Sequence, residues 1–216
     1  MQNAMACNVR AISKIESLQY EEAFNLLRTS MLSLTGYLRK TIEISDMEDK
    51  YPPTESRIIL LPSGVNPDIE RFYSAAFLFS IPGNRISQRQ IDYCTAVCLF
   101  NMALACQLEL EASTDCRKRS ALSAQARILY LKAYELLQRY PIEPTDNIIL
   151  LLMALAANVM EIELELGSVD DIRFWKGILE ASGAASDPLL FVGTSVHAFF
   201  NSVYVSPGDV VAAKAA

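Results

Sequence analysis

Apolar positions recur every three or four residues at the start of the chain, which is the spacing of one helix face. The first run is Ala4, Cys7, Ala11, Ile15 and Leu18. After a break, the same spacing resumes at Tyr20 and continues to about Ile44. The pattern predicts two helices that pair as a hairpin over residues 4–45.

The pattern changes in residues 46–86. The polar stretch DMEDKYPPTES (46–56) contains two prolines, which stop a helix. Two short apolar runs follow, each ended by proline and glycine, and they predict strands at about 57–61 and 72–80. We expect a small two-stranded β insert, although the connection between the strands is longer than a tight hairpin turn.

Helical periodicity returns in residues 87–184. Four helices are expected. The first runs from an N-cap at Ser87 to Ala112, and the second begins within the stretch TDCRKRS and ends before Pro141. The third runs from about Pro144 to Leu166 with a stop at Gly167, and the fourth from Ser168 to Gly183. They predict two further hairpins. In the tail, residues 185–216, we expect one short helix near 190–204 and a frayed end.

The most apolar stretch, residues 147–167, raises the question of a membrane span. Its uninterrupted apolar run, Ile148–Ala157, has ten residues, whereas a span needs about 20. Glu161, Glu163 and Glu165 follow, and three carboxylates would be costly in lipid. The stretch therefore predicts a soluble helix that neighbours cover on several sides.

Three segments of the chain read as a helix, a turn and a second helix. Their matching positions are Tyr20 and Ala23, the triplet Ala126, Tyr130 and Ala133, the turn residue Gly167, and the mid-helix motifs NMA (101–103) and NVM (158–160). This arrangement resembles the tetratricopeptide repeat (TPR), a helical hairpin of about 34 residues. The resemblance implies a mainly α fold of stacked antiparallel hairpins. Together with the β insert at 46–86, which lies outside the repeat, we expect a single TPR-like domain over 1–216.

The chain also departs from the family pattern. The residue at the first-helix crossing is Ala11, Ala103 or Met160 in the three hairpins, and never glycine. In the last hairpin, the small-aromatic-small triplet is replaced by Ile172, Lys176 and Leu179. The overall layout is similar to a large set of algal proteins with an early hairpin, a strand-bearing insert and two further hairpins.

The resemblance implies a concave face that binds a partner. In peptide-binding TPR proteins an asparagine on this face can grip the ligand backbone. The corresponding residues here are Val97, Phe100, Asn101, Leu104, Gln107, Leu108, Asn158, Glu161, Leu164 and Glu165. This apolar strip with acidic edges suits an amphipathic helix or an extended segment with basic flanks.

Two alternatives stay open for this face. In the first, Asn101 and Asn158 form hydrogen bonds to a neighbouring helix instead of a ligand. In the second, which we favour, the insert or the apolar tail of the same chain fills the groove. Chaperone-binding TPR domains clamp a carboxylate with cations. Because the matching positions here are Asn8, Ile12, Ala154 and Asn158, a carboxylate ligand is disfavoured.

Composition narrows the partner and the compartment. A net charge of −6 and a pI near 4.9 argue against a nucleic-acid surface. The start of the chain lacks a long apolar run, so no secretory signal is expected. Five cysteines are too few for a disulfide scaffold, which favours reduced thiols and a cytoplasmic or nuclear location.

Catalytic and metal chemistry is not indicated by any motif. Cys94, Cys98 and Cys106 are expected to pack in the core, and the single histidine, His197, has no partner by motif. We interpret the glutamates at 161, 163 and 165 as a solvated helix end. Trp175 is expected to pack between hairpins.

These observations favour a noncatalytic protein–protein interaction scaffold that binds a peptide or helix of an unknown partner, without cofactor or metal. One alternative is a small-molecule binding protein or enzyme with a pocket between the insert and the helices. Another is a homo-oligomer that pairs through exposed strand edges of the insert.

Overall fold

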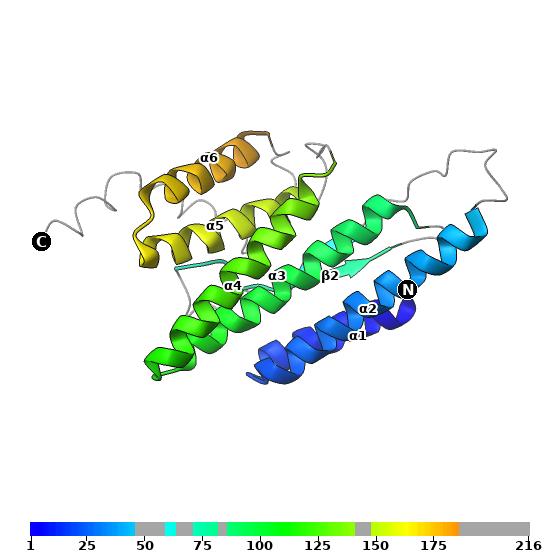
Figure 1. The fold of residues 1–216 in the computed structure, drawn as a ribbon, viewed down its shortest axis with the longest axis horizontal. Helices are drawn as coiled ribbons and strands as arrows, with labels where there is room; N and C mark the ends of the chain where they lie inside the picture. The colour runs from blue at the N-terminus through cyan, green and yellow to red at the C-terminus, as the bar shows by residue number, and fades with distance from the viewer. Residues whose placement is uncertain (46–58, 64–70, 82–85, 141–147, 186–216) are drawn as a thin grey trace, which may run out of the picture.

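Six helices and two strands make up the part of the chain that the computed structural model describes, namely residues 1–45, 59–63, 71–81, 86–140 and 148–185. The helices are α1 (Gln2–Glu16), α2 (Tyr20–Ser45), α3 (Gln88–Ala112), α4 (Cys116–Leu137), α5 (Ile148–Leu166) and α6 (Val169–Ala185). Each odd-numbered helix packs on the helix that follows it, and the three pairs lie side by side in chain order (Figure 1). The fold is mainly α, as predicted.

Local sequence explains where the helices begin and end. Ser87 caps α3 through a capping box with Gln90, in which each side chain accepts from the other residue's backbone N–H. The Asp115 side chain accepts hydrogen bonds at the start of α4. At the end of α5, Gly167 has φ 77°, a conformation that glycine adopts without strain. The predicted N-cap at Ser87 and stop at Gly167 are therefore confirmed.

Helix α3 is the centre of the fold. It contacts α2, α4, α1 and α5, and one hydrophobic core includes side chains from all six helices and from β2 (Phe77–Ser80). Among the described residues, α3 is also the one helix long and apolar enough to cross a membrane, but 94% of its most apolar window is buried inside the protein. Burial of this kind is what the central helix of a folded core requires.

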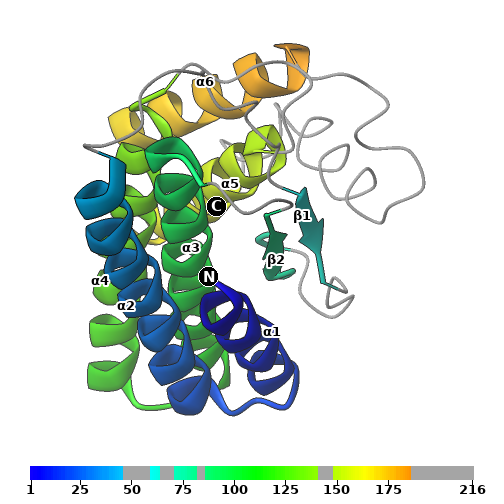
Figure 2. The same cartoon turned by 90° about the vertical axis from the view of Figure 1, so that its right-hand side faces the viewer.

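The two strands form a small antiparallel ladder beside the helices. Strand β1 (Ile59–Pro62) pairs with β2 in a register that places Ile59 opposite Ser80 and Pro62 opposite Phe77. Figure 2 shows the strands on the side of α1, α3 and α5, whereas α2 and α4 lie on the opposite side. Strand β2 contacts α1 and α3.

The predicted strand over 72–80 is too long, because only residues 77–80 are strand. The residues before Phe77 have no regular structure, since the backbone of Tyr73 bonds to a helix side chain instead of a neighbouring strand. The start predicted near Pro144, the tail with its helix at 190–204, and His197 lie outside the described residues.

Candidate functional site

Residues 71–81, which we call the inner segment, run along the face formed by α1, α3 and α5. The six consecutive residues from Phe72 to Phe77 are each at most 6% exposed. This is core-like burial for a stretch that is mostly not helix or strand. Its backbone polar groups therefore need partners inside the protein.

Asn158 on α5 supplies both partners for the backbone of Tyr73. Its Oδ1 accepts from the Tyr73 N–H at 2.7 Å, and its Nδ2 donates to the Tyr73 carbonyl at 3.0 Å. The second Nδ2 hydrogen goes to the Tyr130 hydroxyl at 2.8 Å, which in turn donates to Gln107 Oε1 at 2.9 Å. Both hydrogens of this buried amide are thus used, and its oxygen is paired.

Asn101 on α3 binds both backbone polar groups of Phe77 in the same way. Its Oδ1 accepts from the Phe77 N–H and its Nδ2 donates to the Phe77 carbonyl, both at 2.9 Å. Asn8 on α1 donates to the same carbonyl at 3.1 Å and accepts from Asn101 Nδ2 at 3.0 Å. Asn8, Asn101 and Asn158, which we call the asparagine ladder, are each 0% exposed.

The structure brings Asn101 and Asn158 onto one peptide backbone, and that backbone belongs to the chain itself. In the described residues, therefore, it is the insert that fills the groove. The Asn101–Asn8 bond also joins two helices, so Asn101 serves a neighbouring helix as well. Sequence reasoning placed Asn8 only among possible carboxylate-clamp positions and missed its contact with Phe77. The signal available was that Asn8, like Asn101 and Asn158, lies on the first helix of a hairpin.

Aromatic rings fill the space around the ladder. The rings of Tyr73 and Phe77 stack with centroids 5.5 Å apart, and Phe100 on α3 lies 5.3 Å from Phe77. Tyr130 lies 5.4 Å from Phe100. Burial raises the pKa of the Tyr73 and Tyr130 hydroxyls well above the usual range, so both remain neutral at physiological pH.

The other candidate residues on α3 lie in the same core. Val97 and Leu104 are 0% exposed, and Leu108 is 8% exposed. Leu164 on α5 is only half-buried. The predicted apolar strip is therefore mostly covered.

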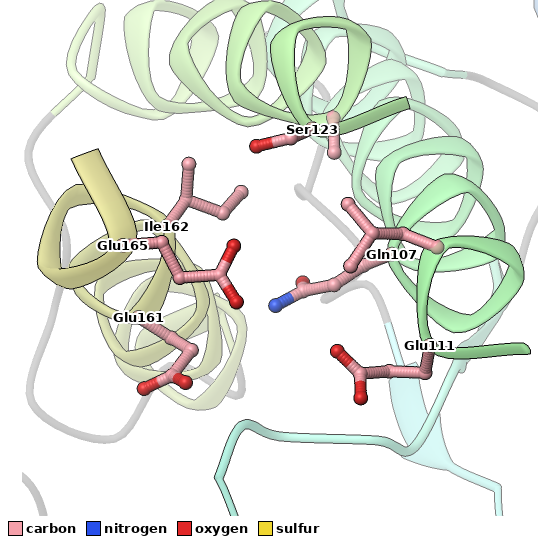
Figure 3. A pocket seen from close by; sticks show the side chains of 8 residues that line it. Gln107, Glu111, Ser123, Glu161, Ile162 and Glu165 are labelled. Carbon is pink, nitrogen blue, oxygen red and sulfur yellow. The ribbon is translucent and has the colours of Figure 1, made fainter. Parts of the chain in front are cut away.

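Three carboxylates, which we call the acidic edge, surround one end of the inner segment. Arg71 Nη2 lies 2.5 Å from Glu111, and Arg71 Nη1 lies 3.6 Å from Glu161 and 3.8 Å from Glu165. Figure 3 shows the three carboxyl groups around one gap between α3 and α5, with Gln107 beside them. Burial, together with Glu165 and Glu111, raises the pKa of Glu161, although Arg71 acts in the opposite direction.

The cavity at this gap is small. Its volume is about 10 Å³, and its lining includes Gln107, Ile162 and Ser123. A space of this size holds about one water molecule. It offers no room for a metabolite between α3, α4 and α5.

The interpretation of all three glutamates as a solvated helix end is wrong for Glu163. That side chain is 1% exposed, and its Oε1 lies 2.5 Å from Nε of Arg127 on α4. Successive residues turn by about 100° around a helix, so Glu163 faces α4 while Glu161 and Glu165 face the acidic edge. The expected packing of Trp175 between hairpins is confirmed, because its ring contacts Tyr134 of α4 at 4.8 Å.

The cysteines on α3 are buried, as predicted. Burial raises the pKa of Cys94 well above its usual value and that of Cys98 and Cys106 to about 12. Within the described ranges, no group of three or more His, Cys, Asp or Glu side chains is placed to hold a metal ion. Cys116, at the start of α4, is exposed.

A larger hollow, about 620 Å³, lies on the other side of the molecule between α2 and α4, with α3 beneath it. Its lining is mostly apolar: Phe24, Met31, Leu32, Leu99, Met102, Leu129 and Leu136, with Arg28, Lys132 and Glu135 among the polar residues. The sequence reasoning did not identify it, because its residues come from three helices.

Comparison of this chain with protein-family models, curated proteins and solved structures finds no match. The function must therefore be inferred from the geometry of the groove and the ladder.

Proposed function

We propose that this chain is a noncatalytic, TPR-like interaction scaffold whose groove along α1, α3 and α5 binds an extended peptide of a protein partner. One observation carries the proposal: Asn101 and Asn158 each bind both the N–H and the carbonyl of a single residue. Paired amide contacts of this kind recognise a peptide backbone whatever its side chains are.

The packing of the second helices supports the resemblance to TPR proteins. Ala126, Tyr130 and Ala133 on α4, the small-aromatic-small triplet, are all 0% exposed. Small residues at a crossing let two antiparallel helices approach closely, and the large residue fills the groove between neighbours. Helices stacked in this way present one continuous face, on which the ladder lies.

The alternative of a small-molecule site between the insert and the helices has less support. Pockets for such ligands usually measure about 300–1,000 Å³, whereas the cavity beside the acidic edge measures about 10 Å³. Around the ladder, the tyrosine hydroxyls are neutral and engaged in hydrogen bonds or packing. A peptide that replaces the inner segment needs no additional cavity.

Oligomerisation through the strand edge is also less favoured at β2. The N–H and carbonyl of Phe77 point away from β1 and are bound by Asn101 and Asn8. That part of the edge is therefore not available for a strand from a second copy.

Photo-crosslinking in the cells that produce the protein would test the proposal. A photoreactive residue replaces Glu165, which is exposed at the acidic edge, and a matched control replaces Ile128, which is 52% exposed on α4. We expect a protein partner to crosslink at position 165 and not at position 128. No specific crosslink at 165, or equal crosslinks at both positions, would argue against a partner in this groove.

A further inference from the structure

The inner segment indicates which residues the groove accepts at each position. The ladder holds Tyr73 and Phe77, which are four positions apart. Ser74, Ala75 and Ala76 lie between them and are 6%, 0% and 1% exposed. Because these three are buried against the protein, larger side chains there would meet packed atoms, so the groove requires small residues between the two held positions.

The two held positions favour aromatic side chains. Tyr73 and Phe77 are each 0% exposed, and their rings stack on each other. Phe100 lies edge-on to Phe77, which adds a preferred aromatic geometry to the hydrophobic burial. An aliphatic residue could fill part of this space but would lose the ring contacts.

The acidic edge adds a charge requirement before the first aromatic residue. Arg71, two positions ahead of Tyr73, faces Glu111, Glu161 and Glu165. One guanidinium cannot neutralise three carboxylates, so this end of the groove keeps an excess of negative charge. A peptide with a second or third cation before its aromatic residue would interact more favourably here than the inner segment does.

We infer, on the basis of the proposed function, that the partner peptide carries one or more cations, an aromatic residue two positions later, three small residues and a second aromatic residue. The inner segment is the internal occupant that such a peptide displaces. A short tether holds an internal occupant at an effective concentration of about 1 mM. A partner at about 1 μM must therefore bind roughly a thousandfold more tightly, and the additional cations supply part of that difference.

Peptide rescue of a weakened chain tests this inference. In the full chain, Tyr73→Leu and Phe77→Leu keep apolar bulk in the inner segment but remove its rings. The probe is a synthetic peptide, RFYSAAFLF, which copies residues 71–79 and carries a Gly-Ser tail. At about 100-fold excess over Kd we expect the peptide to raise the Tm of this double variant by about 5–10 °C.

Three matched peptides separate the requirements. Replacement of the arginine by glutamate should weaken binding about tenfold, and a further peptide, KRRFYSAAFLF, should bind more tightly than the probe. A peptide with leucine at both ring positions should give a clearly smaller shift. Equal shifts with all four peptides would overturn the inferred pattern.

The absence of any shift, with helical circular dichroism retained, would also overturn the inference. If the double variant does not fold, the single Tyr73→Leu variant is used, and hydrogen exchange at the Phe77 amide with and without peptide is the readout. Unchanged exchange then counts against displacement. A dimer that forms in place of peptide binding would assign the groove to a second copy and overturn the inference.

The outcomes remain distinct from a failure of the proposed function. A partner that crosslinks at position 165 while the probe does not bind rejects only the sequence pattern. The lack of any crosslinked partner rejects the scaffold function even if the probe binds.

Discussion

Asn101 donates a hydrogen bond from Nδ2 to Oδ1 of Asn8 at 3.0 Å, although the two residues lie 93 positions apart in the chain. Both amides also donate to the carbonyl of Phe77. The three residues thus join α1, α3 and β2 at one buried point. Because both Nδ2 hydrogens of Asn101 are used there, the loss of its amide leaves buried polar groups without partners.

The variant Asn101→Asp tests this point with almost no change in shape. At neutral pH a carboxylate oxygen would face the Phe77 carbonyl and Asn8 Oδ1, so we expect a loss of about 3 kcal/mol or more in unfolding free energy. Protonation restores one donor, so the difference from the natural protein should shrink as pH falls from 7.5 to 5. Chemical denaturation at both pH values measures it. The control Asn25→Asp, at an exposed position on α2, should change stability by about 0.5 kcal/mol or less.

The hydroxyl of Tyr130 links Asn158 to Gln107. Tyr130→Phe removes that link and leaves two buried amides short of a partner, so we expect a loss of about 1–3 kcal/mol. Tyr134→Phe on the same helix is the control, because its hydroxyl bonds to the side chain of Gln138 on the neighbouring turn, near the surface. Urea denaturation of the two variants compares them. Equal losses would mean that the buried link contributes nothing specific.

Glu161 gives a prediction about pH. Its folded pKa lies above the ordinary value of 4.5, chiefly through burial. Ionisation of this carboxyl therefore opposes folding: the cost is absent below pH 4.5 and grows as pH rises through the folded pKa. Glu161→Gln removes the ionisation, so the stability of the variant relative to the natural protein should increase as pH rises above 4.5. A relative stability that falls with pH would contradict the assigned direction.

Thiol labelling tests the burial of the cysteines. Of the five, only Cys116 is exposed, and burial raises the pKa of Cys98 and Cys106 to about 12. The native protein should therefore react quickly at one thiol with a thiolate-specific reagent at pH 8, and at five thiols after unfolding. Cys116→Ser should abolish the fast reaction. More than one fast equivalent in the native protein would contradict the packing of α3.

The helix boundaries were predictable where local chemistry sets them. Ser87 and Gln90 satisfy each other's backbone within one helical turn, and Gly167 supplies a left-handed residue at a helix end. Both signals are visible in a few adjacent residues. The three helix pairs follow from the spacing of their apolar positions in the same local way.

The path of the inner segment could not be predicted from local sequence. Its aromatic residues favour a strand from 72 onward, but the partner of Tyr73 is a side chain 85 positions away. Strand propensity depends on the residue types within the segment, so it carries no information about an amide that is distant in the sequence. Glu163 is a similar case, because its burial depends on Arg127 of another helix. Asn101 and Asn158 were found through a family resemblance, whereas their occupant required the fold.

The bonds of the ladder to the inner segment have a consequence for how the chain folds. Helix pairs close over short sequence distances and assemble early, whereas the contacts of Tyr73 and Phe77 span 24 to 85 positions. Three helices must be aligned before any of these contacts can form together. We therefore expect the inner segment to insert late in refolding, when the helices that carry the asparagine ladder are already aligned.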